Sequence, residues 1–190
     1  MTRPTGILIA AGQSRRFGSD KLLHPLADGT PLAVASFRNL KPACAEVLAV
    51  LRPDQEELAG RLWNEGARIV ISEDSHAGMG HSLATGVRAS AGAAGWLLAL
   101  ADMPYVKTAT MHQLAQALAK GASITAPMHG AKRGNPVGFS GKWYEALLQL
   151  SGDAGARSLL LAHADELSLL MCEDSGVHRD IDTLQDLLAV

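Results

Sequence analysis

Three basic side chains lie within one glycine-containing segment near the start of the chain. They are Arg15, Arg16 and Lys21, in the run Ala10-Ala-Gly-Gln-Ser-Arg-Arg-Phe-Gly-Ser-Asp-Lys21. Gly12 and Gly18 permit tight turns that bring backbone N–H groups close to a phosphate. A polyanion bound here would meet amides and cations together. The segment therefore predicts a phosphate site; the alternative is an ordinary surface loop with solvated arginines.

Two common phosphate-binding motifs do not fit this segment. A dinucleotide fingerprint requires G-x-G-x-x-G, but Ser14 and Phe17 occupy the second and third glycine positions. A Walker A loop requires G-x-x-x-x-G-K-[ST], but Gly12 and Gly18 are one residue too far apart, and Ser19 follows Gly18. The phosphate site is therefore of another kind.

Two aspartates further along the chain are candidates for a metal site. Asp102 follows the apolar run that ends in Ala99-Leu-Ala, and Pro104 stops that run. An aspartate at the end of a strand is well placed to hold a metal ion, although a turn or helix cap explains it equally well. Asp182 lies in Arg179-Asp-Ile-Asp-Thr-Leu-Gln-Asp186, where helix capping is the simpler explanation.

Alternating strands and helices are expected to position these residues. Short apolar runs predict strands at Gly6–Ala10, Val47–Leu51, Arg68–Ile71, Trp96–Leu100, Ser123–Ala126 and Leu167–Met171. Helices are expected at Pro53–Glu65, Gly80–Ala91, Lys107–Lys120, Gly141–Leu150, Gly155–Ala164 and Thr183–Val190, with Thr108 or Thr110 capping the third and Gly121 ending it. This order implies an α/β fold with a mostly parallel sheet, whose ligands bind beyond the carboxyl ends of the strands.

Composition narrows the class of protein. The 190 residues fit one domain, 47% are apolar, and a net charge of −2 provides no basic field for nucleic acid. Cys44 and Cys172 form no CxxC pair, and the histidines lack metal-binding spacing. No apolar run is long enough to span a membrane or to form a usual signal peptide, so the expected compartment is the cytoplasm.

The segment Leu8–Leu23 resembles the signature of the nucleotidyltransferases related to those of molybdenum-cofactor biosynthesis, the MobA-like NTP transferases. Five segments match that family in order, between Ile7 and Leu187. The resemblance implies one domain over residues 1–190 with a Rossmann-like three-layer α/β/α sandwich of the nucleotide-diphospho-sugar transferase type. It also implies that Arg16 binds the outer phosphates and that Lys21 binds the α-phosphate.

The same resemblance implies roles for the remaining candidates. Asp102 and Asp182 would hold Mg²⁺, although Leu184 replaces the proline that related enzymes carry in Asp-Ile-Asp-Thr-Pro. The nucleotide would contact Ala10, Ala11, Gly12, Arg15, Gly80 and Ser82. The acceptor would contact Arg133, Asn135 and Arg157, for which surface charge and a turn before Pro136 are the alternatives.

The base is predicted from one methyl group. The guanylyltransferase branch carries Leu-Ala-Gly-Gly where this chain has Ile9-Ala-Ala-Gly12, and the Ala11 methyl narrows the space beside the base. Lys21-Leu-Leu and Gly78-Met-Gly-His-Ser-Leu also resemble the cytidylyltransferase branch. We therefore expect transfer of CMP from CTP to molybdopterin, with release of pyrophosphate.

Other functions remain open at this stage. Within the class, the base is guanine or the acceptor is another phosphate. From another class, the chain is a non-catalytic carrier that delivers the molybdenum cofactor to a molybdenum hydroxylase apo-enzyme. A nicotinamide oxidoreductase is disfavoured because the dinucleotide fingerprint fails.

Overall fold

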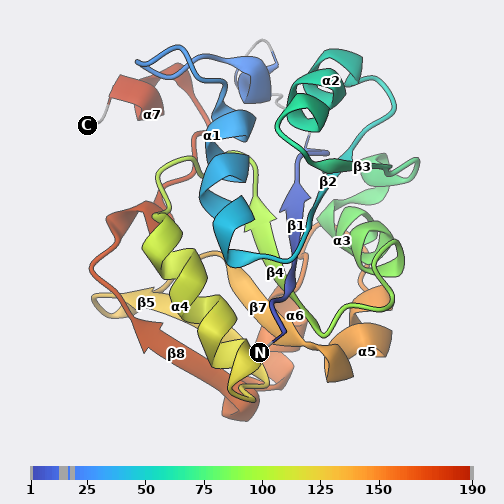
Figure 1. The fold of residues 1–190 in the computed structure, drawn as a ribbon, viewed down its shortest axis with the longest axis vertical. Helices are drawn as coiled ribbons and strands as arrows, with labels where there is room; N and C mark the ends of the chain where they lie inside the picture. Colours follow the sequence, from blue (N-terminus) through green and yellow to red (C-terminus); the bar gives the residue numbers. More distant parts are fainter. Residues whose placement is uncertain (1, 13–16, 18–19, 189–190) are drawn as a thin grey trace.

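An eight-stranded mixed sheet forms the middle layer of the computed structural model, which describes residues 2–12, 17 and 20–188 (Figure 1). The strand order is β3-β2-β1-β4-β7-β5-β6, and β8 pairs with β5. The strands are β1 Thr5–Ile9, β2 Val47–Leu51, β3 Arg68–Ile71, β4 Gly95–Leu100, β5 Ile124–His129, β6 Lys132–Arg133, β7 Val137–Ser140 and β8 Leu167–Met171.

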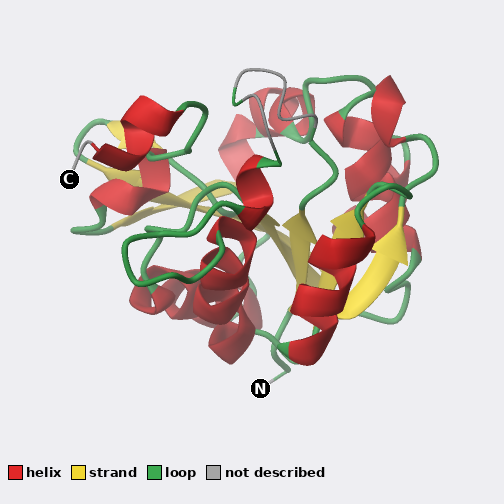
Figure 2. Ribbon diagram, turned by 90° about the horizontal axis from the view of Figure 1, so that it is seen from above, coloured by secondary structure: helices red, strands yellow, loops and turns green. Residues whose placement is uncertain are grey.

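Helices cover both faces of this sheet. They are α1 Leu32–Leu40, α2 Glu56–Asn64, α3 Met79–Arg88, α4 Thr108–Ala119, α5 Tyr144–Leu148, α6 Arg157–Ala162 and α7 Leu184–Leu188. In the view of Figure 1, α1 and α4 lie in front of the sheet, and Figure 2 gives the view from above. The predicted three-layer α/β/α architecture is confirmed.

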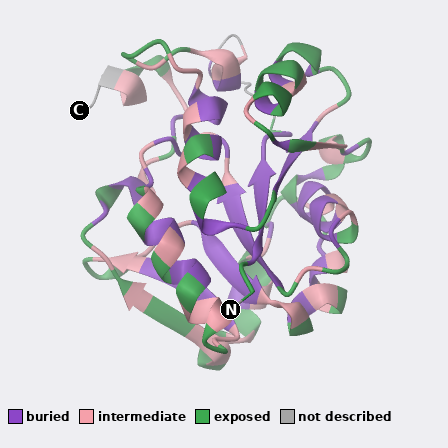
Figure 3. Cartoon of the chain, in the orientation of Figure 1, coloured by how far each residue is buried: buried purple, intermediate pink, exposed green. Residues whose placement is uncertain are grey.

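Alternation along β1 explains why the sheet has two separate cores. Ile7 and Ile9 pack with α3, α5 and α6, whereas Leu8 between them packs with α1, α2 and α4. Successive strand residues point to opposite faces, so a strand that is apolar throughout requires helices on both. Figure 3 shows buried central strands between helices whose outer turns are exposed, whereas β8 is exposed or half-buried along its length.

The sheet is mostly parallel, as predicted, with β7 and β6 as its antiparallel strands and a further parallel pair in β5 and β8. β1 runs parallel to β2 and β4, and β3 is parallel to β2. β7, which the sequence did not predict, lies antiparallel between β4 and β5. The strand predicted at Ser123–Ala126 is also longer, because β5 continues to His129 and there forms a hairpin with β6.

The cap predicted for α4 is wrong, because Thr108 is the first residue of that helix and its N-cap is Lys107. The backbone N–H of Lys107 and the Thr110 hydroxyl, at the start of α4, both donate to the buried carboxylate of Asp174, at 2.9 and 2.6 Å. Ser82 lies inside α3, whose N-cap is Gly78. Gly121 does follow the end of α4 with φ of +99°, as predicted for a helix terminus.

The carboxyl ends of β1 and β4 lie side by side, because the two strands are parallel and paired from Thr5↔Trp96 to Ile9↔Leu100. The C-terminal segment returns to this edge, where the Ile181 N–H donates to the Asp102 carbonyl at 2.9 Å. Three chain segments therefore meet at one edge of the sheet. No helix in the described part of the chain is long and apolar enough to span a bilayer.

Candidate functional site

A lysine and two aspartates meet where β1 and β4 end. Lys21 Nζ donates to Asp102 Oδ2 at 2.8 Å, to Asp182 Oδ1 at 3.2 Å and to the Ile181 carbonyl at 2.8 Å. Asp102 is 81 residues from Lys21, and Asp182 is 161 residues from it. The structure therefore brings together three of the predicted site residues, and it places the ammonium between the two predicted metal ligands.

Local structure holds each member of this Lys21–Asp102–Asp182 cluster. Lys21 begins a short 3₁₀ helix, which the Asp20 carboxylate caps by accepting from the Leu22 N–H at 3.2 Å. The Leu22 side chain is buried in the core and anchors that turn. Asp102 is the second residue after β4, and the hydrogen bond from the Ile181 N–H to its carbonyl fixes the neighbouring Asp182.

The electrostatics of the cluster favour a charged lysine. Burial of the ammonium opposes its charge, but the carboxylates of Asp102 and Asp182 outweigh burial and raise the pKa of Lys21 above its ordinary value. Only 12% of the Lys21 side chain is exposed, against 23% of Asp102 and 44% of Asp182. The cluster is therefore partly buried, and its single ammonium is paired with both carboxylates.

The same oxygens suit a divalent cation. Asp102 Oδ1 is buried and has no hydrogen-bond partner in the described part of the chain. Together with Asp182 and the Ile181 carbonyl it makes an all-oxygen set, which Mg²⁺ and Mn²⁺ prefer. No cluster of three or more His, Cys, Asp or Glu fit to hold a metal occurs among the described residues. Two carboxylates suffice for Mg²⁺, which usually takes its remaining ligands from water and substrate phosphates.

Asp186 fixes the segment that carries Asp182. Its Oδ2 accepts from the Asp182 N–H at 3.0 Å, the Thr183 N–H at 2.7 Å and the Thr183 hydroxyl at 2.9 Å. The hydrogen bonds from Thr183 lower the pKa of Asp186 below its ordinary value. Helix capping is the alternative explanation for Asp182. In the structure Asp186 accepts the hydrogen bonds at the start of the helix, and the Asp182 carboxylate accepts from Lys21.

The predicted phosphate loop is held from the β2–α2 connection. Gln55 Nε2 donates to the Ala10 carbonyl at 3.1 Å, and Arg52 Nη1 donates to the Gly12 carbonyl. Beside Gly12, the space where a Cβ would stand is open, with no atom of the described chain within 4 Å. Ala11 is buried. Arg15 and Arg16 lie outside the described residues, so their predicted contacts stay predictions.

Packing accounts for the glycine at position 80. A Cβ on Gly80 would meet the backbone of Ser151 at 2.5 Å, and the Gly80 N–H donates to the Gly152 carbonyl at 2.8 Å. Ser82 is buried two residues further along α3. Nucleotide contacts of both residues therefore stay predictions, and the glycine has a structural reason of its own.

The three predicted acceptor residues line one open cleft of about 690 Å³. Arg133, Asn135 and Arg157 share it with an apolar wall that includes Ile9 and Leu100, the last residues of β1 and β4. Burial and the positive charge of Arg157 lower the pKa of Arg133, so the two guanidinium groups lie close together. Neither forms an ion pair with a carboxylate of the described chain. Asp153 also lines the cleft, so the two positive charges of the cleft exceed its one negative charge.

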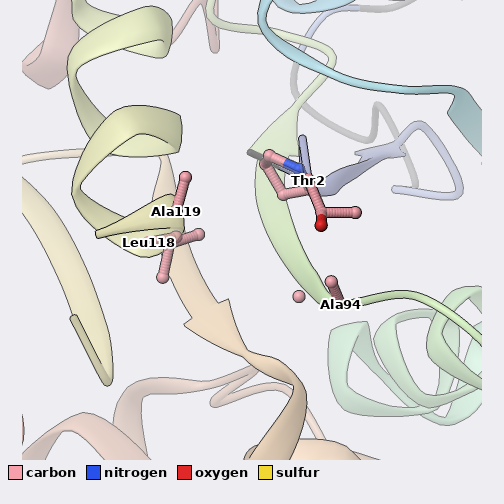
Figure 4. A pocket seen from close by; sticks show the side chains of 6 residues that line it. Thr2, Ala94, Leu118 and Ala119 are labelled. Carbon is pink, nitrogen blue, oxygen red and sulfur yellow. The ribbon is translucent and has the colours of Figure 1, made fainter. Parts of the chain in front are cut away.

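A second cavity lies at the opposite end of the sheet. Figure 4 shows Thr2 and Ala94 on one side of it and Leu118 and Ala119 of α4 on the other. Pro4 and Gly95 complete its lining, so none of its lining residues carries a titratable side chain. It offers neither an acid, a base nor a metal ligand for chemistry.

Sequence reasoning missed Arg52 and Gln55. Both lie in Leu51-Arg-Pro-Asp-Gln, which looks like an ordinary turn before a helix. The one signal was their place directly after β2, at the same edge of the sheet as the phosphate loop.

A family model described as the MobA-like NTP transferase domain matches residues 6–167. The chain belongs to this family. A protein named nicotine blue oxidoreductase from Paenarthrobacter nicotinovorans is 31% identical over 96% of this chain and 94% of its own length. A probable molybdenum cofactor guanylyltransferase from Chloroflexus aggregans is 35% identical over 59% of this chain and 52% of its own.

Two crystal structures of Rv0371c from Mycobacterium tuberculosis H37Rv are similar to this MobA-like chain over its whole length. Their TM-scores are 0.86 and 0.81, at 27% and 26% identity, and the alignments cover 98% and 100% of those chains. The second is a complex with manganese. The family model, which matches residues 6–167, includes Lys21 and Asp102, whereas Asp182 lies beyond that range.

Proposed function

We propose that this MobA-like nucleotidyltransferase moves CMP from CTP to the phosphate of molybdopterin and releases pyrophosphate. The observation that carries the proposal is the pairing of two unlike sites at one edge of the sheet. One is a carboxylate pair suited to a cation, Asp102 and Asp182, and the other is a cleft in which Arg133 and Arg157 have no carboxylate partner in the described chain. Joining two anions requires both.

The residues divide the work between binding and charge stabilisation. Asp102 and Asp182 would hold Mg²⁺, which supplies positive charge against the phosphate oxygens when it is bound. A relative that binds manganese supports a divalent ion here. Arg16 then binds the outer phosphates and helps pyrophosphate to leave, and Lys21 stabilises charge at the α-phosphorus.

On the acceptor side, Arg133 and Arg157 bind the molybdopterin phosphate, and Asn135 hydrogen-bonds the pterin edge. The acceptor phosphate attacks the α-phosphorus in line, so the bond to the β-phosphate oxygen breaks as the new P–O bond forms. A phosphate is already a nucleophilic anion, so the enzyme needs to align it rather than deprotonate it.

Cytosine is the proposed base because Ala11 stands where the guanylyltransferase branch has glycine. Ala11 is buried directly before Gly12, and the space beside Gly12 is open. A methyl group narrows that space and favours the smaller pyrimidine. The relatives named guanylyltransferases keep guanine as the alternative base.

The deciding experiment is a panel of CTP, GTP, ATP and UTP, each with molybdopterin and Mg²⁺, followed by pyrophosphate release. We expect pyrophosphate release with CTP to be at least roughly tenfold faster than with GTP, which is the discrimination that a small difference in the fit of a binding pocket provides. Equal or higher release with GTP would overturn the base assignment. No release with any nucleotide would overturn the nucleotidyltransferase function.

One relative favours a second candidate, reduction of a flat heterocycle, because a protein named an oxidoreductase matches nearly the whole chain. Oxidation of NADH or NADPH without nucleotide consumption would support it. We also propose that the protein is a single domain over residues 1–190 and that it acts in the cytoplasm. There it would deliver the finished cofactor to a molybdenum hydroxylase apo-enzyme. Co-purification with such an apo-enzyme tests it.

A further inference from the structure

Two side chains from the β2–α2 connection hold the carbonyl groups of the predicted phosphate loop. Gln55 Nε2 donates to the Ala10 carbonyl at 3.1 Å, and Arg52 Nη1 donates to the Gly12 carbonyl. The two residues are also tied to each other, because the Arg52 N–H donates to Gln55 Oε1 at 2.8 Å. We call Arg52 and Gln55 the carbonyl clamp.

The clamp is built rather than incidental. Gln55 is 4% exposed, and both ends of its amide are used, one on Ala10 and one on Arg52. Four-fifths of the Arg52 side chain is buried, although its Nε also pairs with the exposed carboxylate of Asp54 at 2.9 Å. A buried amide that makes all these bonds fixes the geometry of the backbone it touches.

Holding carbonyls matters for a loop that binds an anion. A phosphate is attracted by N–H groups and repelled by carbonyl oxygens, so the loop must turn its carbonyls away from the ligand. The Ala10 N–H is already used by the Val50 carbonyl at 2.9 Å. The N–H groups of Ala11 and Gly12 donate to no backbone carbonyl of the described chain. Next to Gly12 lies open space.

We propose that Arg52 and Gln55 are positioning residues, which orient the Ala11 and Gly12 N–H groups toward the triphosphate. Arg52 adds a positive charge behind the loop, which favours the bound anion further. The inference rests on the proposed function, because it names how the same site binds its nucleotide. Arg52 and Gln55, which the sequence did not predict as site residues, would therefore contribute to nucleotide affinity.

The test measures binding of CTP and of CMP by calorimetry in four variants. Gln55→Glu keeps the acceptor for the Arg52 N–H and removes the donor to Ala10, and Arg52→Met removes the donor to Gly12. Arg61→Met and Asp54→Asn are controls: Arg61 is exposed and pairs with Glu57, and Asp54 is the other partner of Arg52. Thermal unfolding without nucleotide reports on folding.

Each clamp variant is expected to weaken CTP binding by roughly fivefold to tenfold, the effect of one lost hydrogen bond near a charged ligand. CMP binding should change less than about twofold, since the monophosphate makes few contacts with the loop. The controls should bind both ligands within about twofold of the wild type. A purely structural role would weaken CTP and CMP alike and lower the unfolding temperature in proportion.

Two results would overturn the clamp. One is wild-type CTP affinity in both clamp variants, and the other is an equal loss of CTP and CMP affinity in Gln55→Glu, the variant of nearly unchanged size. Failure of the proposed function looks different, because the wild-type protein would then bind no nucleoside triphosphate of the panel or release no pyrophosphate.

Discussion

The two ends of the candidate site treat positive charge in opposite ways. At the Lys21–Asp102–Asp182 cluster, one ammonium lies between two carboxylates at 2.8 and 3.2 Å. Arg133 and Arg157 both line the cleft beside it, and no carboxylate of the described chain forms an ion pair with either. At one end every charge has a partner of opposite sign, whereas the other end carries surplus positive charge.

This contrast separates stability from binding. In the cluster, the ammonium stabilises both carboxylates, so removing it takes this partner away from two partly buried negative charges, and removing either carboxylate weakens the pairing of the ammonium. In the cleft, two partly buried guanidinium groups repel each other. Removing one of them should therefore stabilise the protein without ligand but weaken the binding of an anionic ligand. A substitution at one end should therefore lower both stability and activity, and a substitution at the other should raise stability and lower affinity.

The largest effect is expected from Asp102→Asn. This change removes the negative charge of a proposed metal ligand and keeps the size of the side chain. We expect pyrophosphate release to fall by at least about 100-fold, the usual effect of losing one group that stabilises charge in a transition state. The measurement is pyrophosphate release at saturating CTP and molybdopterin.

Glu57→Gln is the matched control for Asp102→Asn. Glu57 is an exposed carboxylate on α2 whose partner is Arg61 at 2.8 Å, so its loss should leave the rate unchanged. Near-normal pyrophosphate release by Asp102→Asn would contradict a role for Asp102 in the reaction.

Arg157→Met is expected to raise the KM for molybdopterin by roughly tenfold to thirtyfold, the loss of one charge-assisted hydrogen bond to a phosphate. The KM for CTP should stay the same, because Arg157 lies on the acceptor side. In the same variant the unfolding temperature should rise by a few degrees, because Arg133 loses its like-charged neighbour.

Exposed Arg88 on α3 provides the comparison for Arg157, since Arg88→Met also removes one positive charge. That variant should keep both KM values and the unfolding temperature. A lower unfolding temperature in Arg157→Met would mean that the arginine pair stabilises the free protein, and the contrast between the two ends would be lost.

Lys21→Met should act in the opposite direction on stability. The carboxylates of Asp102 and Asp182 would lose the ammonium between them, at a cost of about 1–2 kcal/mol because both aspartates are partly exposed. For a chain of this size, the unfolding temperature should fall by about 4 °C.

Magnesium sharpens the Lys21 experiment. In the variant, Mg²⁺ should raise the unfolding temperature more than it does in the wild type, because the metal no longer competes with the ammonium for the same oxygens. Equal Mg²⁺ stabilisation of both proteins would mean that Lys21 and the metal use different sites.

Much of this contrast follows from rules that apply to the sequence. Strands that are apolar throughout must be buried on both faces, which places helices above and below the sheet and the carboxyl ends of β1 and β4 at one edge. The bounds predicted for β2, β3 and β8 agree with the structure. For the same reason, Lys21 and Asp102 meet although 81 residues separate them.

The failures have physical causes that local patterns do not contain. The strand β7 is only four residues long and contains Gly138, which is needed because a Cβ there would lie 2.4 Å from Thr125 Oγ1. The helix α1 was missed because Val34, Ser36 and Phe37 are weak helix formers, and tertiary burial overrides that preference.

Long-range partners account for further contacts that the sequence did not predict. The carboxylate that caps α4 is 67 residues away from Lys107, so no pattern near α4 announces it. Lys21 is predicted to bind the α-phosphate, and its two aspartate partners are 81 and 161 residues away in the chain. The position of a flexible cation depends on which anions are present, which a motif does not specify.

The smallest effect is expected from Asp186→Asn, which tests how firmly Asp182 must be held. Asp186 Oδ2 accepts three hydrogen bonds from Asp182 and Thr183, and an asparagine oxygen accepts them less strongly because it carries no charge. We expect the apparent Mg²⁺ affinity in the pyrophosphate assay to fall by about two- to threefold, with CTP and molybdopterin KM unchanged.

The pKa of Asp186 is lowered, so its hydrogen bonds are present above its ordinary pKa and are lost only as the pH falls through the lowered value. The difference between Asp186→Asn and the wild type should therefore be constant from pH 6 to pH 8, near neutrality. A difference that changes across this range would mean that another titrating group holds Asp182 in place.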